Sequence, residues 1–312
     1  MRRALLFLLK VLLVAPIVAA VVGWFVAPAF LHPMRRELTA DSMKLADVTF
    51  AQLGTHREDL EVRGPDGSLL RGWKVRAAKP NGDWVLLFHG IADNRMGVLE
   101  HARILLLGGY NVVMMDARAH GASEGAMATY GWLERNDTGA IVDALTTTEH
   151  PRHLFALGES MGAGIALQST AVEPRIEAVV AEAAFASLRE ASYDYAGLRR
   201  SPLLGKTLFA PGTWTMIYHA EKLAHLPASE VAPEKAVAAR AFPVLLICDG
   251  NDVALPCRHT QRIYNAARGP KQLWVVPGAF HTAALGYEPD EFRRRVLGFY
   301  DSVRNDASMH GK

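Results

Sequence analysis

A serine stands between two glycines in the segment Gly158-Glu159-Ser160-Met161-Gly162, which follows an apolar run and precedes a stretch rich in alanine and glycine. A strand that turns directly into a helix forces the residue at the corner into a sparsely populated backbone conformation, at a cost of about 1–3 kcal/mol. Glycines two positions away on either side leave the room that such a corner needs. The pattern therefore predicts a strained turn that presents the Ser160 hydroxyl for nucleophilic chemistry.

A serine hydroxyl is a poor nucleophile without a base, and the base needs an acid that orients it. On this kind of turn the acid and then the histidine follow the serine along the chain. The segment 245-LLICDGNDVALP-256 supplies two carboxylates after an apolar strand. We prefer Asp252, in the loop beyond the strand, as the acid. Asp249 lies at the strand tip, where we expect it to cap the turn, and it remains the alternative acid.

Three histidines follow these carboxylates, namely His259, His281 and His310. His281 comes after a strand, a Pro-Gly break and a short loop, which is the place that the chemistry requires. We expect His259 to be a solvated residue at the start of a helix, and His310 lies in the C-terminal tail. The sequence therefore predicts His281 as the base.

Acyl transfer also needs two N–H donors for the oxyanion of the tetrahedral intermediate. The amide of Met161, directly after the serine, is one candidate. Gly90 in the segment 88-FHGIADNR-95 frees the backbone there, so the amide of Ile91 is the second candidate. His89 precedes the serine in the chain, and we expect it to brace this loop by hydrogen bonds.

Short apolar runs alternate with helical patterns from residue 58 onward, which predicts a mostly parallel sheet covered by helices on both faces. Active sites of such sheets lie at the carboxyl ends of the strands, where the residues above fall. A first pair of strands joined by a Pro-Asp-Gly turn occupies residues 58–75. Further strands are expected at 84–90, 111–117, 153–159, 176–185, 243–250 and 272–278, and helices near 94–107, 132–149, 161–172, 258–268 and 290–304.

Residues 186–242 separate two strands by far more than a crossover requires, and they are rich in aromatic residues and prolines. We interpret this interval as a cap inserted over the carboxyl edge of the sheet. The alternative is a pair of ordinary surface helices whose aromatic side chains pack into the core.

The N-terminus differs from the rest of the chain, because residues 11–31 contain no charge and are long enough to cross about 30 Å of hydrocarbon. We therefore divide the chain into an N-terminal membrane anchor (1–34), a linker (35–57) and a catalytic domain (58–312). A cleaved signal peptide is the alternative, since Ala27-Pro28-Ala29 resembles a cleavage site. The basic residues before the apolar run favour a cytoplasmic N-terminus and an extracytoplasmic catalytic domain.

Charge and cysteine content limit the partners. With 34 Lys and Arg against 32 Asp and Glu, the chain has no electrostatic case for nucleic acid. Cys248 and Cys257 are either a disulfide or two buried thiols. The histidines show no metal-ligand spacing, so we expect no metal and no organic cofactor. Oligomeric state is left open.

Five segments in this order resemble the alpha/beta-hydrolase superfamily, namely 89-HGIADN-94, 116-DARAHGASEG-125, 158-GESMG-162, 249-DGNDVALP-256 and 278-GAFH-281. The resemblance covers roughly residues 58–304. Within the superfamily, the chain is similar to the branch of esterases, acylglycerol lipases and serine aminopeptidases. It departs from the family at Cys248-Asp249, where His-Gly is more frequent. It implies an alpha/beta-hydrolase fold with an inserted cap and a serine hydrolase acting on a small-molecule or lipid acyl substrate.

The bond cleaved is left open among ester, thioester and amide. A non-catalytic binding protein of the same fold is the alternative of another class, and an acyltransferase or perhydrolase with the same three residues is a third.

Overall fold

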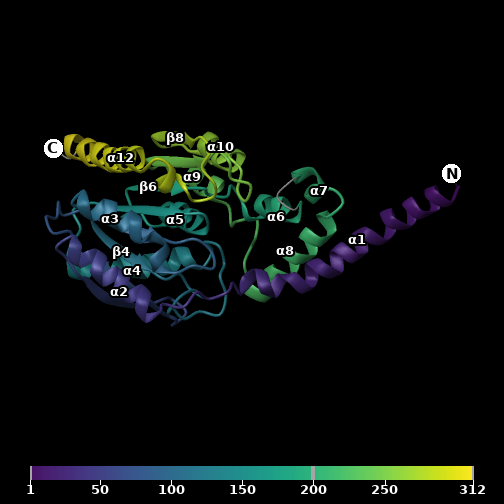
Figure 1. Cartoon of the computed structure of the whole chain (residues 1–312), viewed down its shortest axis with the longest axis horizontal. Coiled ribbons are helices and arrows are strands. Elements are labelled where there is room, and N and C mark those ends of the chain that lie inside the picture. The colour runs from purple at the N-terminus through teal and green to yellow at the C-terminus, as the bar shows by residue number, and fades with distance from the viewer. Residues whose placement is uncertain (1, 198–200, 311–312) are drawn as a thin grey trace.

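The computed structural model describes residues 2–197 and 201–310, and it has a central sheet with helices on both faces (Figure 1). Within these residues the sheet has 8 strands in the order β1-β2-β4-β3-β5-β6-β7-β8. β2 pairs antiparallel with β1 and β4, and the remaining pairs are parallel, as predicted. The strands are β1 (Arg57–Arg63), β2 (Leu69–Val75), β3 (Trp84–Phe88), β4 (Asn111–Met115), β5 (Leu154–Glu159), β6 (Ala178–Glu182), β7 (Val244–Asp249) and β8 (Lys271–Val276).

Both faces of the sheet are buried, because successive side chains of a strand point to opposite faces. On β3, Val85 and Leu87 belong to one apolar core, and Trp84 and Leu86 belong to the other. The first core is covered by η1 (Arg95–Val98), α3 (Leu99–Leu107), α11 (Ala284–Tyr287) and α12 (Pro289–His310). The second is covered by α4 (Glu134–Glu149), α5 (Met161–Val172), α9 (Pro233–Ala239) and α10 (Arg258–Ala266).

A helix occupies most of the segment that the sequence analysis assigns to a linker. Thr39 caps the N-terminus of this helix, α2 (Ala40–Gln52), and its side chain accepts a hydrogen bond from the Ser42 amide. Its Phe50 is fully buried and meets the ring of Trp73 edge to face. The predicted linker 35–57 is therefore wrong over residues 40–52, because one apolar face of this segment packs into the first core.

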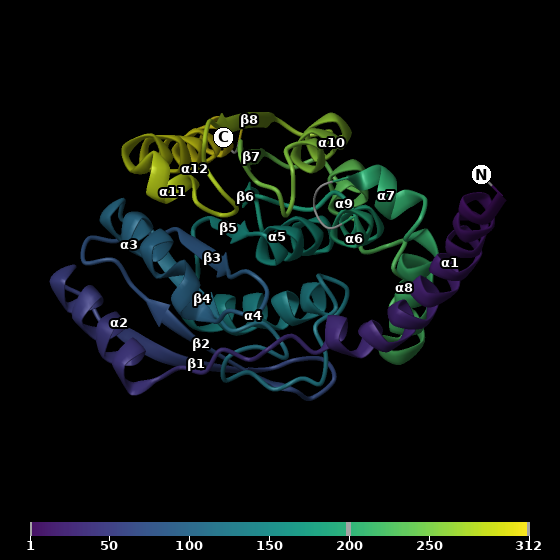
Figure 2. The same cartoon turned by 45° about the vertical axis from the view of Figure 1, so that its right-hand side comes forward.

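The interval between β6 and β7 forms four helices in the described part of the chain, namely α6 (Leu188–Ala196), α7 (Pro202–Lys206), α8 (Ala210–Ala224) and α9. The first three lie beyond the carboxyl edge of the sheet (Figure 2). α9 instead packs against α5 and α10 and places Val237 in the second core. The predicted cap 186–242 is therefore too long at its C-terminal end, because α9 belongs to the layer that covers the sheet.

The N-terminal helix α1 (Arg2–Leu31) lies beside α8 and extends away from the sheet (Figures 1 and 2). The two helices run in the same direction, since Thr215 Oγ1 donates to the Ala20 carbonyl (2.7 Å) and His219 Nδ1 donates to the Trp24 carbonyl (2.8 Å). The segment Leu13–Leu31 has a mean hydropathy of 2.2 and is 11% buried, so it is long and apolar enough to cross a membrane.

Candidate active site

Ser160 occupies the turn between β5 and α5, and its backbone has φ 53° and ψ −117°. This positive φ is the strained conformation that the sequence pattern predicts. A β-carbon on Gly158 would lie 2.3 Å from the Gly162 carbonyl oxygen, and one on Gly162 would lie 2.2 Å from the Phe88 carbonyl oxygen. Both flanking glycines are therefore required for the close approach of α5 to β5 and β3.

The structure brings Ser160, His281 and Asp252 into one hydrogen-bonded row. His281 Nε2 lies 2.9 Å from Ser160 Oγ, and His281 Nδ1 lies 2.6 Å from Asp252 Oδ2. The three come from the turn after β5, the loop after β7 and the loop after β8. These loops meet because the parallel strands place their carboxyl ends at one edge of the sheet.

The Asp252 carboxylate is fixed on both oxygens. Its second oxygen, Oδ1, accepts hydrogen bonds from the amides of Ala254 (2.7 Å) and Leu255 (2.9 Å). Burial acts to raise the pKa of Asp252, but the hydrogen bond and charge of His281 and these two amides outweigh it and hold the pKa below its ordinary value. Asp252 is therefore ionised at neutral pH and can hold the imidazole in one tautomer.

Asp249 does not contact His281 and does not cap its own turn, contrary to our expectation. Its Oδ2 accepts a hydrogen bond from the amide of Thr282, the residue after His281, at 2.8 Å. Thr282 has φ 54°, a strained conformation for a β-branched residue. Burial, followed by the neighbouring charge of Glu182, raises the pKa of Asp249 to about 8. Asp249 is therefore protonated at neutral pH and holds the turn that presents His281.

Glu182, the last residue of β6, completes this buried acidic pair. Its Oε1 accepts a hydrogen bond from the amide of Ala284 at 2.9 Å, and its Oε2 lies 3.8 Å from Nε2 of the buried His101. The carboxyl groups of Glu182 and Asp249 are within hydrogen-bond reach of each other through the Asp249 proton. Together the pair anchors residues 282–284, a contact between β6, β7 and the histidine loop that no local sequence pattern indicates.

The other two histidine candidates lie outside this row. His259 is 1% exposed, donates from Nε2 to Asp194 (2.6 Å) and accepts at Nδ1 from the Ala186 amide (3.2 Å). The expectation of a solvated His259 is therefore wrong, because the residue ties α10 to the start of the cap. His310 is the last residue of α12.

Ile91 and Met161 both border the cavity in front of Ser160, together with the serine itself. In the part of the chain that the structure describes, neither amide N–H has a hydrogen-bond partner within the protein. The loop at Gly90 lies next to the serine, since a β-carbon built on Gly90 would be in ordinary van der Waals contact with Ser160 Cβ at 3.7 Å. Two free donors beside a nucleophile are the arrangement that stabilises a developing oxyanion.

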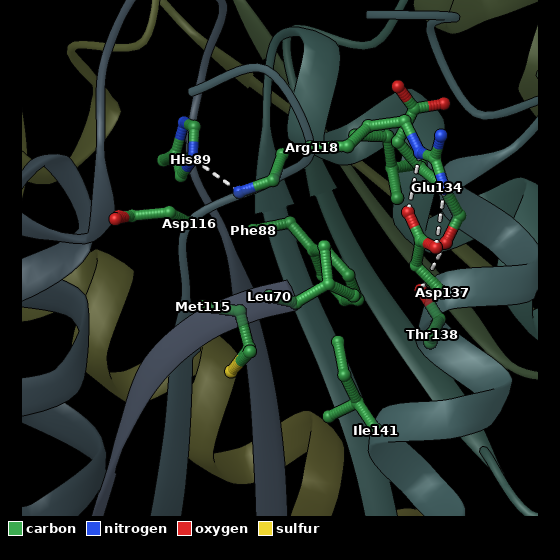
Figure 3. A pocket seen from close by; sticks show the side chains of 12 residues that line it. Leu70, Phe88, His89, Met115, Asp116, Arg118, Glu134, Asp137, Thr138 and Ile141 are labelled. Atoms are coloured by element: carbon green, nitrogen blue, oxygen red, sulfur yellow. Dashed lines mark hydrogen bonds and ion pairs between the residues drawn. The ribbon is translucent and has the colours of Figure 1, made fainter. Parts of the chain in front are cut away.

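His89 braces the loop that carries Ile91. Its Nδ1 donates to the Gly90 carbonyl (2.7 Å) and its Nε2 accepts from the Ala117 amide (3.0 Å). Burial, aided by the nearby His120, lowers the pKa of His89 to about 4, so the ring is neutral. Figure 3 shows the dashed hydrogen bond at the His89 ring, which agrees with the expected bracing role.

Two buried ion pairs fix the loop after β4. Arg95 binds Asp116 through Nε and Nη2 (3.1 and 2.7 Å), and Arg118 binds Asp137 through Nε and Nη2 (both 2.7 Å; Figure 3). Arg35, in the segment after α1, donates to the carbonyls of Ser123 and Gly125 in the same loop. The loop therefore connects the catalytic edge of the sheet to the end of the N-terminal helix.

A disulfide joins Cys248 and Cys257, with 5.4 Å between their Cα atoms. The nine-residue separation encloses the loop that carries Asp252. The sequence left this pairing open, and the structure shows the bonded form.

A cavity of about 610 Å³ opens in front of Ser160 and is lined mainly by apolar side chains. Its walls come from the cap helices, from the loops around Ser160 and from α1. The contribution of α1 was missed in the sequence analysis. A signal for it exists, because Ala15, Ala19, Gly23 and Ala27 recur at every fourth position, a spacing typical of membrane helices that pack against a partner.

Comparisons with known proteins agree with this architecture. The family model described as "Serine aminopeptidase, S33" matches residues 79–210. The protein YqkD of Bacillus subtilis (strain 168) is 28% identical over 247 residues, which are 77% of each chain. The protein Rv2307c of Mycobacterium tuberculosis (strain ATCC 25618 / H37Rv) is 30% identical over 252 residues, 79% of this chain and 77% of that one.

Solved structures show the same fold. The esterase Pf2001 of Pyrococcus furiosus superposes with a TM-score of 0.69 at 22% identity, over 88% of this chain and 98% of that one. A structure described as a membrane phospholipase A and bacterial virulence factor has a TM-score of 0.63 at 20% identity, and the match covers 98% of this chain and 100% of that one. The chain belongs to the alpha/beta-hydrolase superfamily.

Proposed function

We propose that this protein is a membrane-anchored serine hydrolase that cleaves carboxylic esters through Ser160, His281 and Asp252. The observation that carries the proposal is the row of two short hydrogen bonds, 2.9 Å from Ser160 Oγ to His281 Nε2 and 2.6 Å from His281 Nδ1 to Asp252. This geometry supports the assignment of Ser160 as nucleophile, His281 as base and Asp252 as the ionised acid, the order that acyl transfer needs.

In the first step, Ser160 Oγ attacks the substrate carbonyl while His281 Nε2 accepts its proton. Asp252 stabilises the imidazolium that forms, and the amides of Ile91 and Met161 bind the oxyanion. His281 then gives the proton to the leaving alcohol, and the acyl-enzyme remains. Water, activated by His281, attacks this ester, and the carboxylic acid leaves as the serine regains its proton.

The lining of the cavity favours an ester over the free N-terminus of a peptide. An aminopeptidase has to bind the substrate's charged α-ammonium group, which calls for a carboxylate near the nucleophile. Among the described residues that line the cavity there is no Asp or Glu. An apolar acyl group fits these walls better than an ammonium group, so we favour esterase activity over aminopeptidase activity.

We propose that α1 is retained as a single-pass anchor. Ala27 and Leu31 are fully buried in the core that joins α1 to the cap, and the Tyr130 hydroxyl donates to the Phe30 carbonyl at 2.7 Å. Cleavage after Ala29 would remove part of this packed core. The Cys248–Cys257 disulfide supports an extracytoplasmic catalytic domain, because such bonds persist in oxidising compartments.

Labelling with a small fluorophosphonate tests the proposal, because the reagent bonds only to an activated serine. We expect it to modify Ser160 in the parent and to leave Ser160→Ala unlabelled and inactive on p-nitrophenyl butyrate. Ser169→Ala is the matched control. Ser169 lies on α5, the helix that follows Ser160, and its Oγ is 3.0 Å from Thr138 Oγ1, so it does not line the cavity. An unlabelled parent, or a Ser160→Ala variant with parental turnover, would contradict the proposal.

A further inference from the structure

The N-terminal helix forms one wall of the cavity in front of Ser160. Its lining residues are Ala19, Val22, Gly23, Val26, Ala29 and Phe30. Opposite them lie residues of α6 and α8, with Ser160 and Met161 at the catalytic edge. At about 610 Å³ the cavity has the size of a binding site for one small ligand. A helix with the composition of a membrane anchor is therefore part of the substrate site.

α1 is fixed against the cap by close backbone contact. A β-carbon on Gly23 would lie 2.0 Å from the Gly212 carbonyl oxygen, so only glycine fits at this crossing. The Thr215 hydroxyl and the His219 ring hydrogen-bond to α1 carbonyls, and the His219 ring stacks on Trp24 at 3.8 Å. Small residues and interhelical hydrogen bonds of this kind hold helices together within a bilayer.

The length of α1 places this contact at the membrane. A hydrocarbon core of about 30 Å needs about 20 helical residues. Residues 11–18, the uncharged residues between Lys10 and the first residue of the cavity wall, span only about 12 Å at 1.5 Å per residue. A spanning α1 must therefore carry part of the cavity wall into the bilayer.

The cavity is open along the same helix. Val22 and Val26 line it and are still 54% and 43% exposed, and Val18, one turn earlier on this face, is 53% exposed. The apolar lining of the cavity thus continues into an exposed apolar face of α1. No polar barrier separates the two among the described lining residues of α1.

The cap presents further apolar and aromatic side chains next to α1. Leu203 on α7 and Trp214 and Tyr218 on α8 are 69%, 59% and 54% exposed. Lys206 on α7 lies over the ring of Tyr193 on α6, and Lys222 lies over the ring of Tyr218 on α8. Exposed Trp, Tyr and Lys together are typical of a surface that meets the membrane interface. Figure 1 shows α7, α8 and α1 at the same end of the molecule, away from α12.

We propose that the substrate is an ester lipid of the bilayer, whose long acyl chain lies along Val22 and Val26 between α1 and the cap and whose ester carbonyl reaches Ser160. Hydrolysis consumes one water, breaks the acyl C–O bond and gives a fatty acid and the lipid alcohol. This inference rests on the proposed function, and it adds that the anchor itself binds the substrate.

A pair of matched valine variants tests the wall. Val26→Trp fills the cavity, whereas Val21→Trp adds the same bulk to a residue that is 52% exposed and does not line the cavity. We expect Val26→Trp in the full-length chain to lower hydrolysis of p-nitrophenyl palmitate by about tenfold, the loss of about two buried methylenes. Hydrolysis of p-nitrophenyl butyrate should fall less than that of the palmitate ester in Val26→Trp, because the short chain makes less contact with this wall. Val21→Trp should retain both activities.

A vesicle experiment tests the source of the lipid. The full-length protein is reconstituted into phosphatidylcholine vesicles. A diacyl phospholipid with a fluorescent acyl chain is placed either in these vesicles or in separate, protein-free vesicles. Entry from the bilayer predicts rapid release of labelled fatty acid only when enzyme and lipid share a membrane. Equal rates in the two arrangements would overturn the inference, as would equal loss of palmitate and butyrate hydrolysis in Val26→Trp, or no loss of either.

These outcomes are separable from a failure of the proposed function. If the parent is not labelled by the fluorophosphonate, the hydrolase proposal itself fails. If labelling of Ser160 is intact in all variants and only the chain-length or vesicle results differ from expectation, the serine hydrolase stands and the role of α1 is overturned.

Discussion

Replacing Asp249 by asparagine tests the buried acidic pair behind the histidine loop. An asparagine keeps the shape of the side chain, and its carbonyl oxygen can still accept the Thr282 N–H, while its amide can donate to Glu182 in place of the shared proton. The charged and titratable groups around this position are Glu182, Asp252 and His281. We therefore expect Asp249→Asn to fold and to keep kcat within about threefold of the parent.

The magnitude follows from the pKa of Asp249, which is raised from 3.8 to about 8 in the folded protein. A raised carboxyl pKa means that the folded state holds a proton which the unfolded state has lost, so this stability is present at low pH and declines as pH rises toward 8. The decline is about 1.4 kcal/mol per pH unit while the proton is fully bound. It amounts to about 2.3 kcal/mol between pH 6 and pH 8, because half of the proton is already lost at pH 8. Asp249→Asn has no such proton and should lack this decline.

Thermal unfolding followed by tryptophan fluorescence, at one scan rate and at several pH values, measures the difference. Between pH 6 and pH 8 we expect the parent's Tm to fall relative to Asp249→Asn by about 5–10 °C, at about 2–4 °C per kcal/mol. Asp290→Asn, which removes a carboxylate that is 96% exposed, is the control and should follow the parent. A parallel pH dependence in Asp249→Asn and the parent would refute the protonated state. A loss of kcat by several orders of magnitude with the fold intact would instead identify Asp249 as the catalytic acid.

Three further predictions concern the triad, the disulfide and the anchor. Asp252→Asn should lower kcat by about 10⁴ with little change in Tm, because an amide favours the wrong imidazole tautomer; a small effect on kcat in steady-state assays would remove Asp252 from the mechanism. Cys257→Ser should lower esterase activity, because the disulfide encloses the Asp252 loop. Dithiothreitol should lower the activity of the parent to a similar extent and should not lower the activity of the variant further. Identical activity of the oxidised and reduced protein would refute that role. The full-length chain should stay in the membrane pellet after carbonate extraction, as an apolar span requires, and recovery of the intact N-terminus in the supernatant would contradict the anchor.

The sequence alone determined the features that depend on contiguous residues. The strained turn at Ser160 follows from two glycines at fixed positions, and the buried parallel sheet follows from short apolar runs separated by helical patterns. The order of serine, acid and histidine along the chain then pointed to residues that the structure places in one row. The predicted turn and sheet are confirmed because backbone conformation and strand burial are encoded locally, whereas the catalytic roles of the three residues stay predictions.

Tertiary structure decided which residues from distant segments meet. Asp249 and Asp252 are three residues apart and have the same side chain. Only the packing of β6, β7 and the histidine loop makes Asp249 a buried neutral group and Asp252 an ionised partner of His281. The burial of His259 against Asp194 likewise joins residues 65 positions apart. The part of α1 in the cavity depends on Gly23 meeting Gly212 across nearly two hundred residues. The small residues of α1 indicate a packing face, but only tertiary structure decides that α8 is the partner.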